Sequence, residues 1–123
     1  MNNVKSDTKE KFTVVKPLFN SFSANLSEEL SAYLKTFLNL EMSNVILKLS
    51  EIGEMTEKDA EKLIEVQNQF YENQSSFIIC EVPSSYIPFF KESMNLTPTE
   101  SEAWDIVQME EIERELLNNF NDL

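Results

Sequence analysis

One stretch, residues 44–71, constrains the fold more than any other part of the chain. Segment 45–49 is apolar, rich in β-branched residues and too short for a helix, so it predicts a strand buried on at least one face. The loop that follows, residues 50–55, contains Gly53, the only glycine in the chain. After this loop, apolar residues recur every three or four positions, which predicts an amphipathic helix over residues 56–71. The N-terminus of this helix, with its free N–H groups, is therefore expected at the end of a central strand.

Strand and helix patterns alternate on both sides of this stretch. Further strands are predicted over residues 12–15, 77–82 and 96–97, and further helices over residues 25–38, 84–94 and 99–118. Such alternation favours parallel strands joined by crossover helices. The fold class predicted is α/β, a small mixed sheet of about four to five strands with about four helices packed on it. Residues 1–11 are polar and without periodicity, so we interpret them as a flexible leader before a single domain over residues 12–120.

Charge and hydropathy exclude several classes of partner. The formal net charge is −12, from 22 acidic and 10 basic residues, so binding to nucleic acid or to an anionic membrane surface is disfavoured. No run reaches the ~18 apolar residues of a membrane span, and the N-terminus does not resemble a signal peptide. A cytoplasmic protein without membrane insertion is expected. Cys80 is the only cysteine and falls in a predicted core strand, so it is interpreted as a small hydrophobic residue.

The residues that enzymes use most often are missing from the sequence. The chain has no histidine, which removes the commonest general base and metal ligand. One glycine cannot form a glycine-rich phosphate loop. The pair Glu110 and Glu111 could hold a cation, but both fall in helical positions that the pattern assigns to a solvated face. The sequence therefore predicts no enzyme, no metal site and no cofactor.

The order of predicted elements resembles that of the STAS domain, the fold shared by anti-sigma-factor antagonists and the cytoplasmic tails of sulfate transporters. The resemblance covers about residues 12–117. It is strongest in residues 44–52, which resemble the third strand of the family and the start of its signature loop, and residues 99–107 resemble the start of its last helix. The resemblance implies a non-catalytic protein-binding module in bacterial signalling, whose partner is an anti-sigma factor or a related kinase.

The signature motif of the family is replaced in this chain. Antagonists carry Asp-Ser-Ser-Gly after the central strand, and a partner kinase phosphorylates the first serine. Aligning Met55 with the residue before the motif puts Thr56, Glu57, Lys58 and Asp59 in its four positions. Neither Glu57 nor Lys58 has a hydroxyl, so phosphorylation at the usual site is excluded. Glu57 either imitates part of a phosphate or only stabilises the helix dipole, and Thr56 is either a phosphoacceptor or an N-cap.

The resemblance and the position of the loop together predict a contact surface for a partner protein. Its residues are Gly53, Glu54, Met55, Thr56, Glu57, Lys58, Asp59 and Lys62. As an alternative from another class, the helix N-terminus would bind a small anion or a nucleotide. The carboxylates of Glu54, Glu57 and Asp59 would oppose that ligand.

The C-terminal helix has two apolar stripes that do not share a side. Ala103, Ile106 and Val107 form the first stripe, and the second consists of Met109, Ile112, Leu116 and Phe120, more than a quarter turn away. Either the helix bends around its own domain, or the second stripe meets something else. A second copy of the chain is one such partner, so a homodimer and a self-associating structural subunit remain as alternatives.

Overall fold

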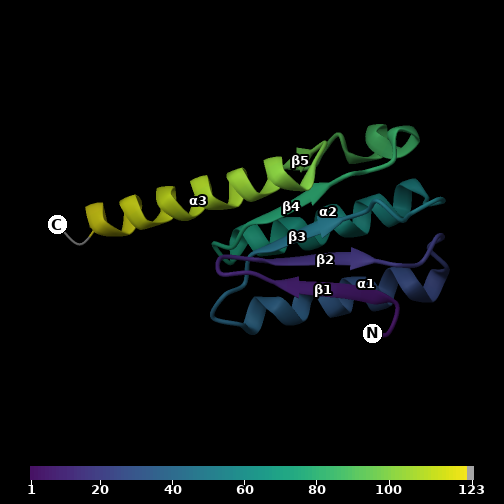
Figure 1. Ribbon diagram of the computed structural model, residues 1–123, viewed down its shortest axis with the longest axis horizontal. Coiled ribbons are helices and arrows are strands. Elements are labelled where there is room, and N and C mark those ends of the chain that lie inside the picture. Colours follow the sequence, from purple (N-terminus) through teal and green to yellow (C-terminus); the bar gives the residue numbers. More distant parts are fainter. Residues whose placement is uncertain (122–123) are drawn as a thin grey trace.

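In the computed structural model, which describes residues 1–121, a five-stranded sheet separates α1 and α2 from α3 (Figure 1). The strands lie in the order β1-β2-β3-β4-β5; β1 is antiparallel to β2, and all the other neighbours are parallel. The predicted α/β class with a small mixed sheet is confirmed. The elements are β1 (Val4–Thr8), β2 (Thr13–Pro17), α1 (Ala24–Lys35), a 3₁₀ turn (Thr36–Asn39), β3 (Val45–Lys48), α2 (Glu57–Glu72), β4 (Phe77–Cys80), a 3₁₀ helix (Ser84–Phe90), β5 (Leu96–Thr97) and α3 (Glu100–Asn121).

The central strand β3 is buried on both faces, as its sequence predicts. Val45, Ile46 and Leu47 have no solvent exposure. Because side chains alternate along a strand, Val45 and Leu47 pack in the cluster beneath α1 and α2, whereas Ile46 packs beneath α3. Burying each of these side chains contributes about 1.5–3 kcal/mol. Burial on both sides fixes β3 in the middle of the molecule.

The predicted capped helix after β3 is confirmed as α2. Thr56 is its N-cap and Asp59 completes a capping box, so each side chain accepts a hydrogen bond from the other residue's backbone N–H. The buried side of α2 includes Leu63, Val66 and Phe70, which pack against the sheet. The cap and the apolar face together fix where α2 begins and which side it turns inward.

The prediction that the first eleven residues lack regular structure is wrong for Val4–Thr8, which form β1. Four of its five side chains are exposed, so it buries too little apolar surface to give a hydrophobic pattern. It is held instead by its antiparallel ladder with β2, in which Ser6 lies opposite Val15. The Ser6 hydroxyl also hydrogen-bonds to the hydroxyl of Tyr33 on α1. A charged, exposed edge strand of this kind is common in natural sheets because it discourages edge-to-edge association.

Two helical predictions need smaller corrections. α1 begins after Ser23, whose hydroxyl accepts a hydrogen bond from the Leu26 N–H at 3.3 Å, two residues before the predicted start. The helix predicted over residues 84–94 is a 3₁₀ helix that ends at Phe90 and includes Pro88. Pro88 has no N–H to donate, which disfavours a continuous α-helix there.

The predicted start of α3 is confirmed, and of the two alternatives for its second half, bending around the domain is not what the structure shows. Thr99 accepts a hydrogen bond from the Glu102 N–H at 3.2 Å, and Ala103 and Val107 are fully buried against the sheet. The second half of the helix continues past the strands instead of bending around them (Figure 1). The second stripe is exposed. Within residues 1–121, no helix is long and apolar enough to cross a membrane.

Candidate functional site

The candidate site lies at the carboxyl ends of the parallel strands, where β3 leads into α2 (Figure 1, right side). We call residues 50–62, which comprise this connection and the first turns of α2, the loop–helix surface. In α/β sheets, ligands and partners commonly bind outside the carboxyl ends of the strands. The amino ends of the parallel strands lie beside the projecting half of α3, so α3 leaves the loop–helix surface uncovered.

Neighbouring segments hold the loop from two sides. The backbone oxygen of Asn20 accepts hydrogen bonds from the N–H groups of Gly53 and Glu54, at 2.6 and 2.9 Å. From the other side, the Tyr86 hydroxyl donates to the Gly53 oxygen at 2.6 Å. A Cβ atom at position 53 would lie 2.2 Å from Oδ1 of Asn20, so the glycine is what allows Asn20 to lie so close. The loop therefore has a defined shape before any partner binds.

The capping box uses two of the backbone donors at the start of α2, the N–H groups of Thr56 and Asp59. Oδ2 of Asp59 accepts from the Thr56 N–H at 2.8 Å and from the Thr56 hydroxyl at 3.0 Å. The Thr56 hydroxyl oxygen in turn accepts from the Asp59 N–H at 3.2 Å. Thr56 is thus an N-cap, and a carboxylate of the chain itself already occupies the helix N-terminus. This arrangement disfavours the small-anion alternative.

The exposed part of the loop–helix surface is acidic. Glu51, Glu54, Glu57 and Glu61 are all exposed, and Lys58 is the one exposed cation among residues 50–62. Lys16 lies 3.7 Å from Glu51 and offsets part of that charge from β2. An acidic surface of this kind attracts a basic partner and repels anions.

The predicted contact residues divide into a surface group and a supporting group. Gly53, Glu54, Thr56, Glu57 and Lys58 are exposed. Met55 and Asp59 are only 8 % and 9 % exposed, so their side chains support the loop and do not form its surface. Lys62 is half-buried and paired with Glu28 of α1, and its hydrogen bond and charge hold the pKa of that carboxyl below its usual value.

Two exposed apolar residues flank the loop–helix surface. Leu18 is 50 % exposed and precedes the segment that bonds to Gly53 through Asn20. Ile87 is 46 % exposed and follows Tyr86, which bonds to Gly53 from the other side. Ile87 also lines an apolar hollow of about 190 Å³, together with Val82, Leu96, Thr97 and Pro98. The sequence does not single out these two residues as contact residues: the spacing of Ile87, Phe90 and Met94 predicts that Ile87 is buried, whereas in the 3₁₀ helix it is exposed.

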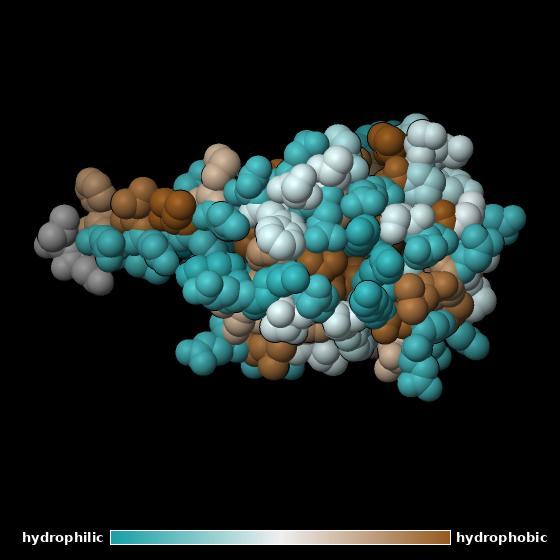
Figure 2. Space-filling view, viewed as in Figure 1, coloured by the Kyte–Doolittle hydropathy of each residue, from teal (hydrophilic) through white to brown (hydrophobic). Residues whose placement is uncertain are grey.

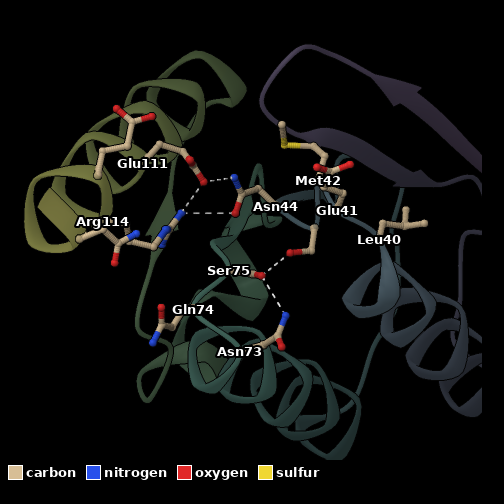
Figure 3. Close-up of a pocket in the computed structure, with 12 residues that line it drawn as sticks. Leu40, Glu41, Met42, Asn44, Asn73, Gln74, Ser75, Glu111 and Arg114 are labelled. Carbon is tan, nitrogen blue, oxygen red and sulfur yellow. Dashed lines mark hydrogen bonds and ion pairs between the residues drawn. The ribbon is translucent and has the colours of Figure 1, made fainter. Parts of the chain in front are cut away.

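A second cavity, about 420 Å³ in volume, lies at the amino ends of β3 and β4, beneath α3 (Figure 3). Asn44, at the start of β3, donates from Nδ2 to Oε1 of Glu111 at 2.7 Å, and Arg114 donates to the same atom at 2.9 Å. Arg114 also donates to the Ser76 hydroxyl oxygen at 2.9 Å. Burial raises the pKa of Glu111, but the hydrogen bonds from Asn44 and Arg114 outweigh it and leave the pKa below its usual value. The polar groups of this cavity bind one another and attach α3 to the sheet.

The prediction that Glu110 and Glu111 lie on a solvated face is wrong. Glu110 accepts from the Tyr71 hydroxyl at 2.8 Å and from Nδ2 of Asn95 at 3.1 Å, while Glu111 joins the cluster in the second cavity. Both carboxylates are therefore docking residues of α3. No group of three or more potential metal-binding side chains comes together within residues 1–121.

Cys80 lies at the end of β4 and is fully buried. Burial raises the pKa of its thiol to about 12, and the nearby carboxylates of Glu81 and Glu100 act in the same direction. A thiol with so high a pKa is a poor nucleophile at neutral pH. The interpretation of Cys80 as a buried hydrophobic residue agrees with this environment.

Comparison with solved structures identifies the fold. A STAS domain protein from Planctomyces limnophilus superimposes with a TM-score of 0.69 at 17 % identity, covering 85 % of this chain and 97 % of that chain. The chain has the fold of a STAS domain. A protein from Thermotoga maritima assigned as an anti-sigma factor antagonist gives a TM-score of 0.71 at 12 % identity, covering 87 % of this chain and 96 % of that one.

A third structure with the STAS fold is a serine-to-glutamate variant of the RsbS protein of Moorella thermoacetica. It gives a TM-score of 0.70 at 12 % identity and covers 87 % of this chain and 96 % of that chain. Neither protein-family models nor curated protein sequences give a match. The predicted STAS resemblance is confirmed for the fold, and the site residues stay a prediction.

Proposed function

We propose that this chain is a non-catalytic protein-binding module of bacterial signalling, located in the cytoplasm, and that the loop–helix surface contacts its partner. The STAS fold supports a regulatory role, since similar structures are described as STAS domain proteins or anti-sigma factor antagonists. The proposed partner is an anti-sigma factor or a related kinase. Its contact region would carry a basic patch, to complement the acids of the loop–helix surface.

One observation carries the proposal: an exposed acidic surface is displayed on a backbone that the chain itself holds in place. The loop is bonded on one side to Asn20 and on the other to Tyr86, and the helix start is capped by Asp59. A preorganised loop loses little conformational entropy on binding, which favours protein recognition. The exposed Leu18 and Ile87 on either side supply apolar contacts next to the charged centre.

The proposed module acts without phosphorylation at the usual position of the family. Glu57 and Lys58 have no hydroxyl, and the Thr56 hydroxyl is engaged with Asp59 as donor and as acceptor. A phosphate on Thr56 would place added negative charge against the Asp59 carboxylate and break the cap. The family's usual phosphorylation position therefore adds no variable charge here, and binding would be set by the amount of partner instead of by a phosphorylation cycle at that position.

Photocrosslinking in the native cells tests the proposal. A photoreactive residue at Lys58 should capture a distinct protein that the same residue at Glu72, exposed at the far end of α2, does not capture. Glu57→Lys should weaken that capture at least about tenfold by reversing the charge, whereas Glu72→Lys, with the same change in net charge, should leave it unchanged. Equal capture from both positions, or equal effects of the two reversals, would contradict the proposed surface.

A further inference from the structure

The second half of α3 carries a row of exposed apolar side chains. Met109, Ile112, Leu116 and Phe120 are 59 %, 55 %, 60 % and 77 % exposed, and the neighbouring Leu117 is 64 % exposed. Figure 2 shows hydrophobic side chains along one edge of the projecting helix, with hydrophilic ones along the other. We call these five residues the α3 stripe. Soluble monomers rarely expose a contiguous apolar row of this size without a partner.

The stripe is turned away from the domain by the contacts that hold the other side of the helix. Glu110 is bonded to Tyr71 and Asn95, and Glu111 and Arg114 are bonded to the start of β3. With 3.6 residues per turn, Met109 and Leu116 lie on nearly the opposite side of the helix from these docking residues. The row therefore faces outward along its length, about 17 Å from Met109 to Phe120 at 1.5 Å per residue.

We propose that two copies of this chain pair through their α3 stripes, with the two helices antiparallel about a two-fold axis near Leu116. With the axis at Leu116 the two helices overlap over residues 111–121, so Ile112, Leu116, Leu117 and Phe120 come into the interface; at roughly 200 Å² each and the fractions given above, they expose roughly 500 Å² of apolar surface per copy. A pair would bury at most roughly 1,000 Å², which is the size of a weak, transient interface. The available area thus suits a modest, reversible dimer.

The distribution of charge along α3 favours this antiparallel arrangement. The acids of the second half, Glu110 to Glu115, precede the amides Asn118 and Asn119. With Leu116 on the axis, Glu113 lies at the level of Asn119 of the partner subunit, and Ile112 lies at the level of Phe120 of the partner subunit. A parallel pair would instead place the acidic segments of both copies at the same level and both domains at the same end, which is unfavourable with a formal charge of −12 per copy.

Overall charge gives the dimer a distinctive response to salt. Each copy has a formal charge of −12, so two copies repel each other at long range. Added salt screens this repulsion and leaves apolar burial intact. The dimer should therefore tighten as salt increases, whereas binding of the acidic helix to a basic partner would weaken.

Sedimentation of the full chain tests the pairing. From about 1 µM to about 1 mM, the wild-type mass should move from monomer toward dimer, and further toward dimer in about 0.5 M salt than in about 0.05 M. Leu116→Glu should raise the dissociation constant at least about tenfold. Asn118→Glu makes the same change in net charge on the other side of the helix and should leave it within a factor of about two.

Disulfide trapping tests the orientation. In an antiparallel pair, Leu116→Cys should form a disulfide dimer under oxidation, because the two Cα atoms lie close to the axis. Glu113→Cys should not crosslink with itself, since its two copies are separated along the pair by about 9 Å. The native Cys80 is buried and does not interfere. A wild-type chain that stays monomeric at the highest concentration and salt, a dimer unaffected by Leu116→Glu, or faster crosslinking at position 113 would each overturn the proposal.

Discussion

Gln67 gives the most direct test of how this domain is held together. It lies on α2 with no solvent exposure, although glutamine is a polar residue. Its Nε2 donates to the backbone oxygens of Phe77 and Asn95, at 2.8 and 3.1 Å. Its Oε1 accepts from the Ser93 hydroxyl and from the Met94 N–H, at 2.9 and 3.0 Å. One side chain thus joins α2 to the start of β4 and to the segment before β5.

We expect Gln67→Leu to lower the free energy of unfolding by about 2–4 kcal/mol. The Met94 N–H loses its acceptor, and leaving such a donor unsatisfied costs about 1–3 kcal/mol. The other three hydrogen bonds contribute about 0.5–1.5 kcal/mol each, partly offset by the added apolar side chain and by remaining partners. The Ser93 hydroxyl keeps one of these partners, since it also donates to the Asn95 oxygen at 3.3 Å.

Urea unfolding followed by circular dichroism measures this effect, with the m-value as a check on two-state behaviour. The melting temperature should fall by about 10 °C. Asn68→Leu makes the same kind of change at the next, exposed position and should stay within about 0.5 kcal/mol of wild type. If Gln67→Leu were as stable as Asn68→Leu, the buried amide would add nothing net to folding, and the reasoning would be refuted.

Three further changes test the cap, the thiol and the docking of α3. Thr56→Ala should lower stability by about 0.5–2 kcal/mol and speed amide exchange in the first turn of α2, and unchanged exchange would show that the cap does not hold the loop–helix surface. Cys80, whose thiol pKa burial raises to about 12, should not react with a thiol reagent at about pH 8 until denaturant is added; prompt labelling of the folded chain would contradict its burial. The net lowering of the pKa of Glu111 means that its contribution to stability is present above the usual value of 4.5 and is lost as pH falls below it. The free energy of unfolding of Glu111→Gln, measured in urea, should therefore lie further below that of the wild type at pH 7 than at about pH 3. An equal loss of stability at both pH values would contradict the hydrogen bonds from Asn44 and Arg114.

The centre of the fold was predictable because its signals are local. The apolar run of β3, the capping box at Thr56 and the periodic face of α2 lie within one continuous stretch, and the structure contains all three. β1 was missed because an exposed edge strand has no apolar pattern in its sequence. It is held by backbone hydrogen bonds to β2, and backbone groups are the same in every residue, so this pairing leaves no signal in the sequence of β1.

The site and α3 were less predictable because their contacts join distant residues. Glu110 is bonded to Tyr71 and Asn95, and Glu111 to Asn44, 67 positions earlier, so neither contact leaves a pattern in the sequence. The exposure of the α3 stripe depends on where the sheet ends beneath the helix. Periodicity gives the side of a helix on which residues lie, but not how far the neighbouring layer extends.

The projecting half of α3 and the loop–helix surface lie at opposite ends of the parallel strands, amino and carboxyl respectively (Figure 1). In a dimer joined through the helices, the two acidic loops would therefore point outward from the far ends of the assembly. Such a molecule is bivalent, and a target that repeats along a scaffold or a filament would hold it by avidity even where each single contact is weak. The dimer would therefore bind clustered targets more tightly than isolated ones.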